Sequence, residues 1–117
     1  MPSRDVRLRI QDILDAIAKI EAYTRGMTFD QFCNNNVVMD AVLMNFAIVG
    51  EAAGSVPVEI QDRYPDIEWR KMREMRHVLI HVYFKVSPKI VWDTIQVDLS
   101  PLVPRLVAVL QAEHASS

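Results

Sequence analysis

Apolar residues recur along this chain at the spacing of an α-helix and almost nowhere at the alternating spacing of a β-strand. Between residues 10 and 20 the large aliphatic side chains are Ile10, Ile13, Leu14, Ile17 and Ile20, which fall on one face of a helix. Only three of the 117 residues are glycine, so the chain offers few tight strand-to-strand turns. The sequence therefore predicts an all-α fold.

Capping residues mark the expected ends of the first helices. Ser3 is a suitable N-cap for the first helix, and Arg25-Gly26 is a suitable stop. Thr28, followed three residues later by Gln31, resembles a capping box and predicts a short helical turn. A second long helix is expected over about 36–54; because it is apolar on most sides, we expect it to be the central buried helix.

Prolines divide the second half of the chain. Pro57 is expected to start a short helix that reaches about Arg63, and Asp66 is expected to cap a long helix over about 67–84. Two Ser-Pro pairs have the signature of an N-cap followed by the first helical position. These pairs, Ser87-Pro88 and Ser100-Pro101, frame either two helices or one kinked helix from 88 to about 113.

Size and composition indicate one domain over residues 1–117, with a tail frayed from about 114. Helices with short connections predict an antiparallel bundle of four to five helices, and the many apolar faces favour a homodimer. No apolar run approaches a membrane span and the N-terminus lacks the apolar centre of a signal peptide, so we expect no membrane association. The lone Cys33 is expected to be a packing residue in a reducing, cytoplasmic environment.

The net charge of −2 argues against a broad basic surface of the kind that binds nucleic acid. A local basic surface remains possible, because four cations fall within seven residues: Arg70, Lys71, Arg73 and Arg76. They lie just before the stretch RHVLIHVY, residues 76–83, which holds two of the three histidines of the chain.

The expected helix over 67–84 divides its surface into two halves. At about 100° per residue, Met72, Met75, Val78, Leu79, Val82 and Tyr83 share one arc, which should face the core. Arg70, Arg73, Arg76, His77 and His81 share the opposite arc. His77 and His81 are neighbours four residues apart, whereas Arg76 and His81 lie about 140° apart and would flank a groove.

An arginine and a histidine on one face suffice, chemically, for RNA cleavage without a metal. The imidazole can transfer a proton at neutral pH, and the guanidinium can stabilise charge that builds on phosphorus. Two other interpretations remain open from the residues alone. His77 and His81 could be two zinc ligands, although no third ligand is evident, or the whole face could be a solvated surface paired with nearby carboxylates.

The pattern R-x-x-x-x-H-x-Y, formed by Arg76, His81 and Tyr83, resembles the signature of the HepT-like toxins of the HEPN (higher eukaryotes and prokaryotes nucleotide-binding) superfamily. His77 fills the polar position that usually follows the Arg of that motif. IVGEAAGSVP resembles a segment of the family's central helix, and YPDIEWRKMREMRHVLIHVYFKVSPKIVWDTI and VDLSPLVPRL resemble later segments. The resemblance covers roughly residues 37–110.

This resemblance implies a dimeric HEPN-like helical bundle and a ribonuclease toxin that uses no metal and no cofactor. It implies that Arg76 and His81 are catalytic, that His77, Arg73 and Glu51 are supporting residues, and that the two protomers' motifs face a shared cleft. The implied partners are RNA and an antitoxin of the MNT (minimal nucleotidyltransferase) type, which can silence such toxins by transferring AMP to the motif tyrosine, here Tyr83. The added negative charge would repel RNA phosphates.

Two positions depart from the family's pattern. Val82 stands where an acidic residue often lies between the His and the Tyr, and Met44 stands where an Arg often precedes the Asn of the central helix, here Asn45.

A carboxylate on the central helix needs a partner, and a motif Arg or His is the natural one for Glu51. The alternative interpretation is a catalytically silent HEPN-type module that binds a nucleotide or a protein partner.

Overall fold

A computed structural model describes the backbone of residues 2–85 and 87–116 and the side chains of residues 5–78 and 87–114. Its elements are α1 (Pro2–Thr24), α2 (Phe29–Cys33), α3 (Asn36–Gly54), α4 (Val58–Arg63), α5 (Trp69–Lys85), α6 (Pro88–Asp93), the π-helix η1 (Thr94–Leu99) and α7 (Ser100–Ser116). No strand occurs in these two described ranges. The all-α prediction is confirmed.

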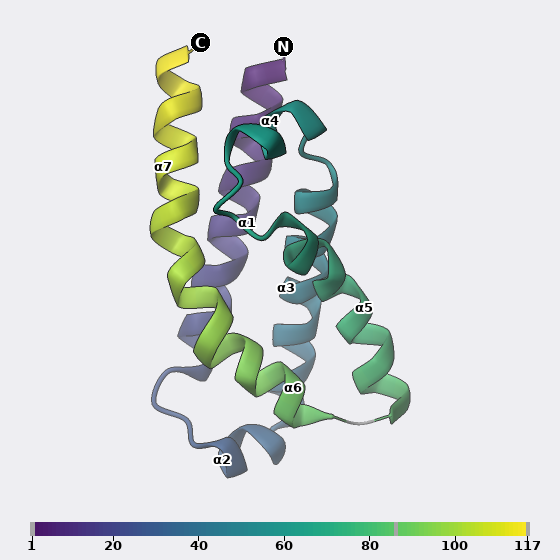
Figure 1. Cartoon of the computed structure of the whole chain (residues 1–117). Helices are drawn as coiled ribbons and strands as arrows, with labels where there is room; N and C mark the ends of the chain where they lie inside the picture. The colour runs from purple at the N-terminus through teal and green to yellow at the C-terminus, as the bar shows by residue number, and fades with distance from the viewer. Residues whose placement is uncertain (1, 86, 117) are drawn as a thin grey trace.

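Four long helices, α1, α3, α5 and α7, make the bundle. α3 packs against both α1 and α5, and α1 also packs against α7. Both chain ends lie at one end of the molecule, with α1 and α7 side by side, and α5 diverges from the bundle toward its own C-terminal end (Figure 1). The largest fully buried side chains come from these four helices, α2 and η1: Ile10, Ile13, Ile17, Ile20, Phe32, Leu43, Phe46, Met72, Leu99 and Leu106.

The first helix ends as predicted but begins earlier. α1 starts at Pro2, so Ser3 lies inside its first turn rather than at the N-cap. Gly26 follows the helix with a φ of 78°, the left-handed conformation that glycine adopts without steric cost. Gln31 and Thr28 form both bonds of a capping box at the start of α2, since the Gln31 amide donates to Thr28 Oγ1 and the Thr28 amide donates to Gln31 Oε1.

The helix α3 is buried on two sides only. Its buried residues, among them Val42, Phe46 and Val49, face α1 and α5. The helix is central, as predicted, because it packs between α1 and α5. It is not buried all round, since Val37, Met44 and Ile48 are 80%, 62% and 38% exposed. These three and Ala41 follow one another at spacings of four, three and four residues, which places them in one stripe along the helix.

By length and composition α3 could cross a membrane, with a mean hydropathy of 1.5 over its most apolar window. The expectation that no apolar segment approaches a membrane span is therefore wrong on those two measures. Packing supplies another cause for the composition, because α1 and α5 both cover the helix and must be met by apolar side chains.

A polar cluster around the buried Glu113 joins the end of α4 to α7. The Tyr64 hydroxyl donates to Glu113 Oε2 at 2.6 Å, and Arg63 Nη1 lies 3.4 Å from the same oxygen. The Glu113 side chain is only 3% exposed, so these two partners compensate a desolvated carboxylate. Burial, followed by the hydrogen bond with Glu113, raises the pKa of Tyr64 to about 12.

The second Ser-Pro pair lies within a continuous helix. α6, η1 and α7 run without a break from Pro88 to Ser116, so the kinked-helix alternative applies. The π-helical turns over Thr94–Leu99 end two residues before Pro101, whose nitrogen carries no hydrogen to donate to the carbonyl one α-turn back. The wider turns accommodate that proline without ending the helix. At the first pair, Ser87 is the N-cap of α6 with Pro88 at the first position, but the Ser87 side chain makes no capping bond.

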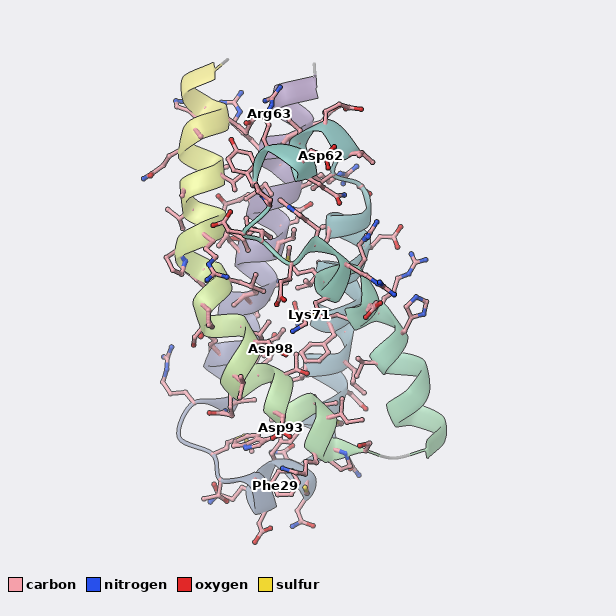
Figure 2. All side chains as sticks on the ribbon, in the orientation of Figure 1. Phe29, Asp62, Arg63, Lys71, Asp93 and Asp98 are labelled. Atoms are coloured by element: carbon pink, nitrogen blue, oxygen red, sulfur yellow. The ribbon has the colours of Figure 1, made fainter. Side chains whose placement is uncertain are left out.

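The far end of α7 is helical beyond the point where fraying was expected. His114 Nδ1 lies 2.6 Å from Arg7 Nη1, which joins the last turns of α7 to the first turns of α1. At the other end of the bundle, Trp92 of α6 packs against Phe32 and Phe29 of α2, with ring centroids 5.3 and 6.1 Å apart. Figure 2 shows Phe29 at this end, beside α6 and its Asp93.

Candidate functional site on helices α3 and α5

A buried tryptophan sets the start of α5, the helix that carries the RHVLIHVY stretch. Trp69 is 5% exposed, and its indole N–H donates to the Tyr64 carbonyl at 3.1 Å. Asp66 is not the N-cap, because the helix begins three residues later and its first backbone bond runs from the Met72 amide to the Glu68 carbonyl. Trp69 is thus a core residue at the point where α5 begins.

The two-sided character predicted for α5 is confirmed over its first ten residues. Met72 and Met75 are buried, whereas Arg73, Arg76 and His77 are exposed. The remaining predicted site residues, His81 and Tyr83, belong to the helical backbone of α5, but their side chains lie outside the described residues. The helix nevertheless places position 81 one turn beyond His77 on the same side.

A glycine brings α3 into direct contact with the backbone of α5. A Cβ atom placed on Gly50 would lie 2.8 Å from the Arg76 amide nitrogen, 3.0 Å from Arg76 Cβ and 3.1 Å from the Arg73 carbonyl oxygen. These distances are shorter than van der Waals contact, so only glycine fits at this position. Gly50 therefore sets how closely the two helices approach beside Arg76.

The residue after Gly50 forms an ion pair with the motif arginine. Arg76 Nη1 donates to Glu51 Oε2 at 2.7 Å, a charge-assisted hydrogen bond between α5 and α3. The Glu51 side chain is 72% exposed, so the premise that it must be paired because it is buried is wrong. Exposed pairs add little stability. The Arg76–Glu51 pair instead fixes geometry, since it holds the Arg76 guanidinium at the surface and turns it toward α3.

A small polar hollow lies beside this ion pair. Its volume is about 230 Å³, and it is lined by Gly50, Glu51, Gly54, Ser55, Arg73 and Arg76. Three of the predicted site residues, Glu51, Arg73 and Arg76, therefore meet at one place. His77 is exposed on the next position of α5 but does not line the hollow.

Sequence reasoning missed the two glycines and Ser55. The signal was present, since two of the three glycines of the chain lie four residues apart in one helix, and small residues at that spacing permit close helix packing. Ser55 donates its hydroxyl to the Glu51 carbonyl at 3.0 Å, closing the end of α3 under the hollow.

A larger hollow, of about 350 Å³, lies on the other side of α5, against η1 and the start of α7. Its floor is apolar, from Met72, Met75 and Leu102, and its rim carries both charge signs. Figure 2 shows Lys71 of α5 and Asp98 of η1 on its two sides. None of the motif residues with described side chains lines it, so we place the candidate site at the smaller hollow.

The chemistry of the two arginines suits a phosphate group. Two guanidiniums at one hollow supply planar, permanently charged donors that match phosphate oxygens. The His77–His81 zinc pair considered from the sequence falls partly outside the described residues, because the His81 side chain is not among them. Within the side chains of residues 5–78 and 87–114, no three His, Cys, Asp or Glu residues gather.

The family model and the named relatives that match this chain all indicate one family of ribonucleases. The family described as Ribonuclease HepT-like matches residues 13–109. A protein of Thermococcus cleftensis named "Probable ribonuclease HepT" is 37% identical over 93 residues, which cover 80% of this chain and 84% of that one. A protein of Methanocaldococcus jannaschii provisionally named an RNase is 36% identical over 95 residues, 81% of this chain and 78% of that one.

A longer protein of the same archaeon is 32% identical over 108 residues, 92% of this chain. It is named as a gamma-glutamylcyclotransferase and, provisionally, an RNase, and this chain spans about half of it, 49%. No solved structure gives a significant match.

Proposed function

Because the chain belongs to the HepT-like ribonuclease family, we propose that it is an endoribonuclease whose catalytic centre lies on the exposed face of α5, with Arg76 and His81 as its catalytic residues. The observation that carries this proposal is the Arg76–Glu51 ion pair, which holds the motif arginine at the surface beside the small polar hollow.

In the proposed reaction, the 2′-oxygen of a ribose attacks the adjacent phosphorus and the bond to the 5′-oxygen breaks, leaving a cyclic phosphate. A proton leaves the 2′-hydroxyl and another is delivered to the departing 5′-oxygen. His81 transfers one of these protons, since imidazole exchanges protons near neutral pH. Arg76 stabilises the negative charge that accumulates on the phosphoryl oxygens. No step requires a metal or a cofactor.

The exposed stripe of α3 supports a homodimer. Val37, Ala41, Met44 and Ile48 follow the spacing of a helix-pairing seam, and the next position of that seam is Glu51. A second copy that covers the stripe would therefore lie next to the Glu51–Arg76 pair. The two motif helices would then share one cleft, which would let the histidine of each copy serve one of the two proton transfers.

The toxin role and its control form the second part of the proposal. An MNT-type nucleotidyltransferase would be the antitoxin, and AMP transfer to Tyr83 would place a phosphate two residues from His81 on α5. Because that phosphate is negative, it would repel the RNA backbone from Arg76. Intact mass measured with and without coexpression of the partner tests this control, and Tyr83→Phe should prevent a gain in multiples of AMP.

Cleavage is tested on RNA in the presence of a chelator. The parent is expected to cut RNA but not DNA of the same sequence, because only RNA carries the internal nucleophile. Arg76→Ala and His81→Ala are each expected to abolish cutting with the helical content unchanged. Arg70→Ala is the matched control, since Arg70 is paired with Glu74 at 3.0 Å on the same helix. Cutting that persists in both motif variants would refute the assignment and favour a catalytically silent binding module.

A further inference from the structure

The hollow between α3 and α5 contains a guanidinium that the proposed reaction does not use. Arg73 lines it one helical turn before Arg76. Among the side chains that the structure describes, Arg73 has no ion pair and no hydrogen bond. Its neighbours differ: Arg70 is paired with Glu74 at 3.0 Å and Lys71 with Glu68 at 3.2 Å.

The carboxylate that lines the hollow, Glu51, already forms an ion pair with Arg76. Glu51 accepts from Arg76 at 2.7 Å, and no described carboxylate forms an ion pair with Arg73 in this hollow, which is open to solvent. A guanidinium with five donors and no ion pair among the described side chains is suited to an oxyanion ligand. The hollow therefore has room and charge for one phosphate group in addition to the group that Arg76 would contact.

The second glycine keeps that room open. A Cβ atom placed on Gly54 would lie 3.9 Å from Arg73 Cγ, an ordinary van der Waals distance, with no other heavy atom nearby. Unlike Gly50, this glycine is not required by helix contact, and an alanine there would occupy part of the hollow beside the arginine stem. Gly54 thus contributes empty space next to the Arg73 side chain.

We propose that Arg73 and the glycine-floored hollow bind the RNA phosphate next to the scissile one, on the side of Arg76 away from His81. Arg73 and Arg76 are offset by about 4.5 Å along the helix axis, and their long side chains can spread further, which suits successive phosphates of one strand. This inference rests on the proposed ribonuclease function. It adds a positioning role: Arg73 fixes the register of the strand, so that the scissile phosphate reaches Arg76.

The test is binding of a short single-stranded RNA whose riboses are all 2′-O-methylated, which removes the nucleophile and prevents cleavage. Affinity is measured at several salt concentrations for the parent, Arg73→Gln and Arg70→Gln. The two variants change the net charge equally, but only Arg73 faces the hollow. A lost contact to a single strand lowers the magnitude of the slope of log K against log salt by about 0.7. That loss is expected for Arg73→Gln and not for Arg70→Gln.

Gly54→Ala provides a second variant that leaves charge unchanged. It is expected to weaken RNA binding several-fold while the unfolding midpoint does not fall, because the methyl group occupies the hollow without a clash. Equal slope changes in Arg73→Gln and Arg70→Gln would overturn the subsite and indicate a diffuse field. If AMP, rather than RNA, loses affinity in Arg73→Gln, the hollow takes the phosphate of a mononucleotide and the RNA assignment is also overturned.

The outcome separates the subsite from the catalytic proposal. A parent that binds the methylated RNA with the expected dependence on Arg73, yet does not cut ordinary RNA, would retain the subsite and refute catalysis. A parent that cuts RNA normally, with Arg73→Gln equal to the parent in binding and in KM, would retain catalysis and refute the subsite.

Discussion

Alanine substitutions at the two glycines of α3 are expected to have opposite effects on stability. At Gly50 the new methyl carbon would approach the Arg76 amide nitrogen to 2.8 Å and the Arg73 carbonyl oxygen to 3.1 Å. Both are backbone atoms of α5, so no side-chain rotation can relieve the contact. At Gly54 the nearest atom is Arg73 Cγ at 3.9 Å, which needs no adjustment.

The size of each change in unfolding free energy follows from two opposing effects, steric overlap and helix propensity. Overpacking a close helix contact costs about 1–3 kcal/mol, whereas alanine is favoured over glycine inside a helix by about 1 kcal/mol. Because backbone atoms are involved, we expect the upper part of the first range, and a net loss of about 1–2 kcal/mol for Gly50→Ala. For Gly54→Ala only the second term applies, reduced because Gly54 is the last residue of α3, and we expect a gain of up to about 1 kcal/mol.

Urea unfolding followed by far-ultraviolet circular dichroism measures both changes, with the slope of free energy against urea checked for constancy. Gly50→Ala should also slow RNA cleavage, because separating α3 from α5 withdraws Glu51 from Arg76. A Gly50→Ala protein at least as stable as the parent would show that the two helices do not meet at this residue, and the account of the site would fail with it.

Three other perturbations have defined outcomes. Glu51→Gln should change the unfolding free energy by less than about 1 kcal/mol, because the ion pair is exposed, yet lower kcat without raising KM; an unchanged kcat would mean that the pair does not orient Arg76. Met44→Glu should shift the protein from dimer to monomer in sedimentation, whereas Val58→Glu, equally exposed on α4, should not; a dimer that survives Met44→Glu excludes the α3 stripe as the interface. Because the pKa of Tyr64 is raised in the folded protein, the unfolded chain loses the hydroxyl proton of Tyr64 at lower pH than the folded one. The contribution of Tyr64 to the unfolding free energy should therefore be complete below about pH 10 and decrease as the pH rises toward about 12. Tyr64→Phe should lower stability at neutral pH by about 1–3 kcal/mol and remove that part of the alkaline loss; an alkaline loss equal to the parent's would contradict the account.

Local signals predicted most of the elements because each depends on residues close together in the chain. The capping box of Thr28 and Gln31, the stop at Gly26 and the short helix after Pro57 all satisfy backbone groups within one or two turns. The errors at Ser3 and Asp66 concern the same kind of signal. In each case a neighbouring residue, Pro2 or Trp69, starts the helix elsewhere.

The polar and apolar faces of α5 were also predicted from the sequence, since helical periodicity assigns Arg73, Arg76 and His77 to the side away from Met72 and Met75. The pairing of Arg76 with Glu51 was anticipated for an incorrect reason. Glu51 is not buried, and the pair forms because Gly50 allows α3 to approach α5 at that residue. Periodicity describes one helix at a time and cannot give the distance between two.

By itself, the sequence determined the all-α class, the helix that carries the motif and the family to which the chain belongs, because periodicity, caps and motif spacing are properties of contiguous residues. Only the tertiary structure decided that the Gly50 contact, the Glu51–Arg76 pair and Arg73 meet around one hollow. It also decided that the apolar stripe of α3 stays exposed. These features depend on how closely α3 packs against α5 and on which faces α1 and α5 leave uncovered, and both are set by side-chain volume at contacts between residues distant in the chain.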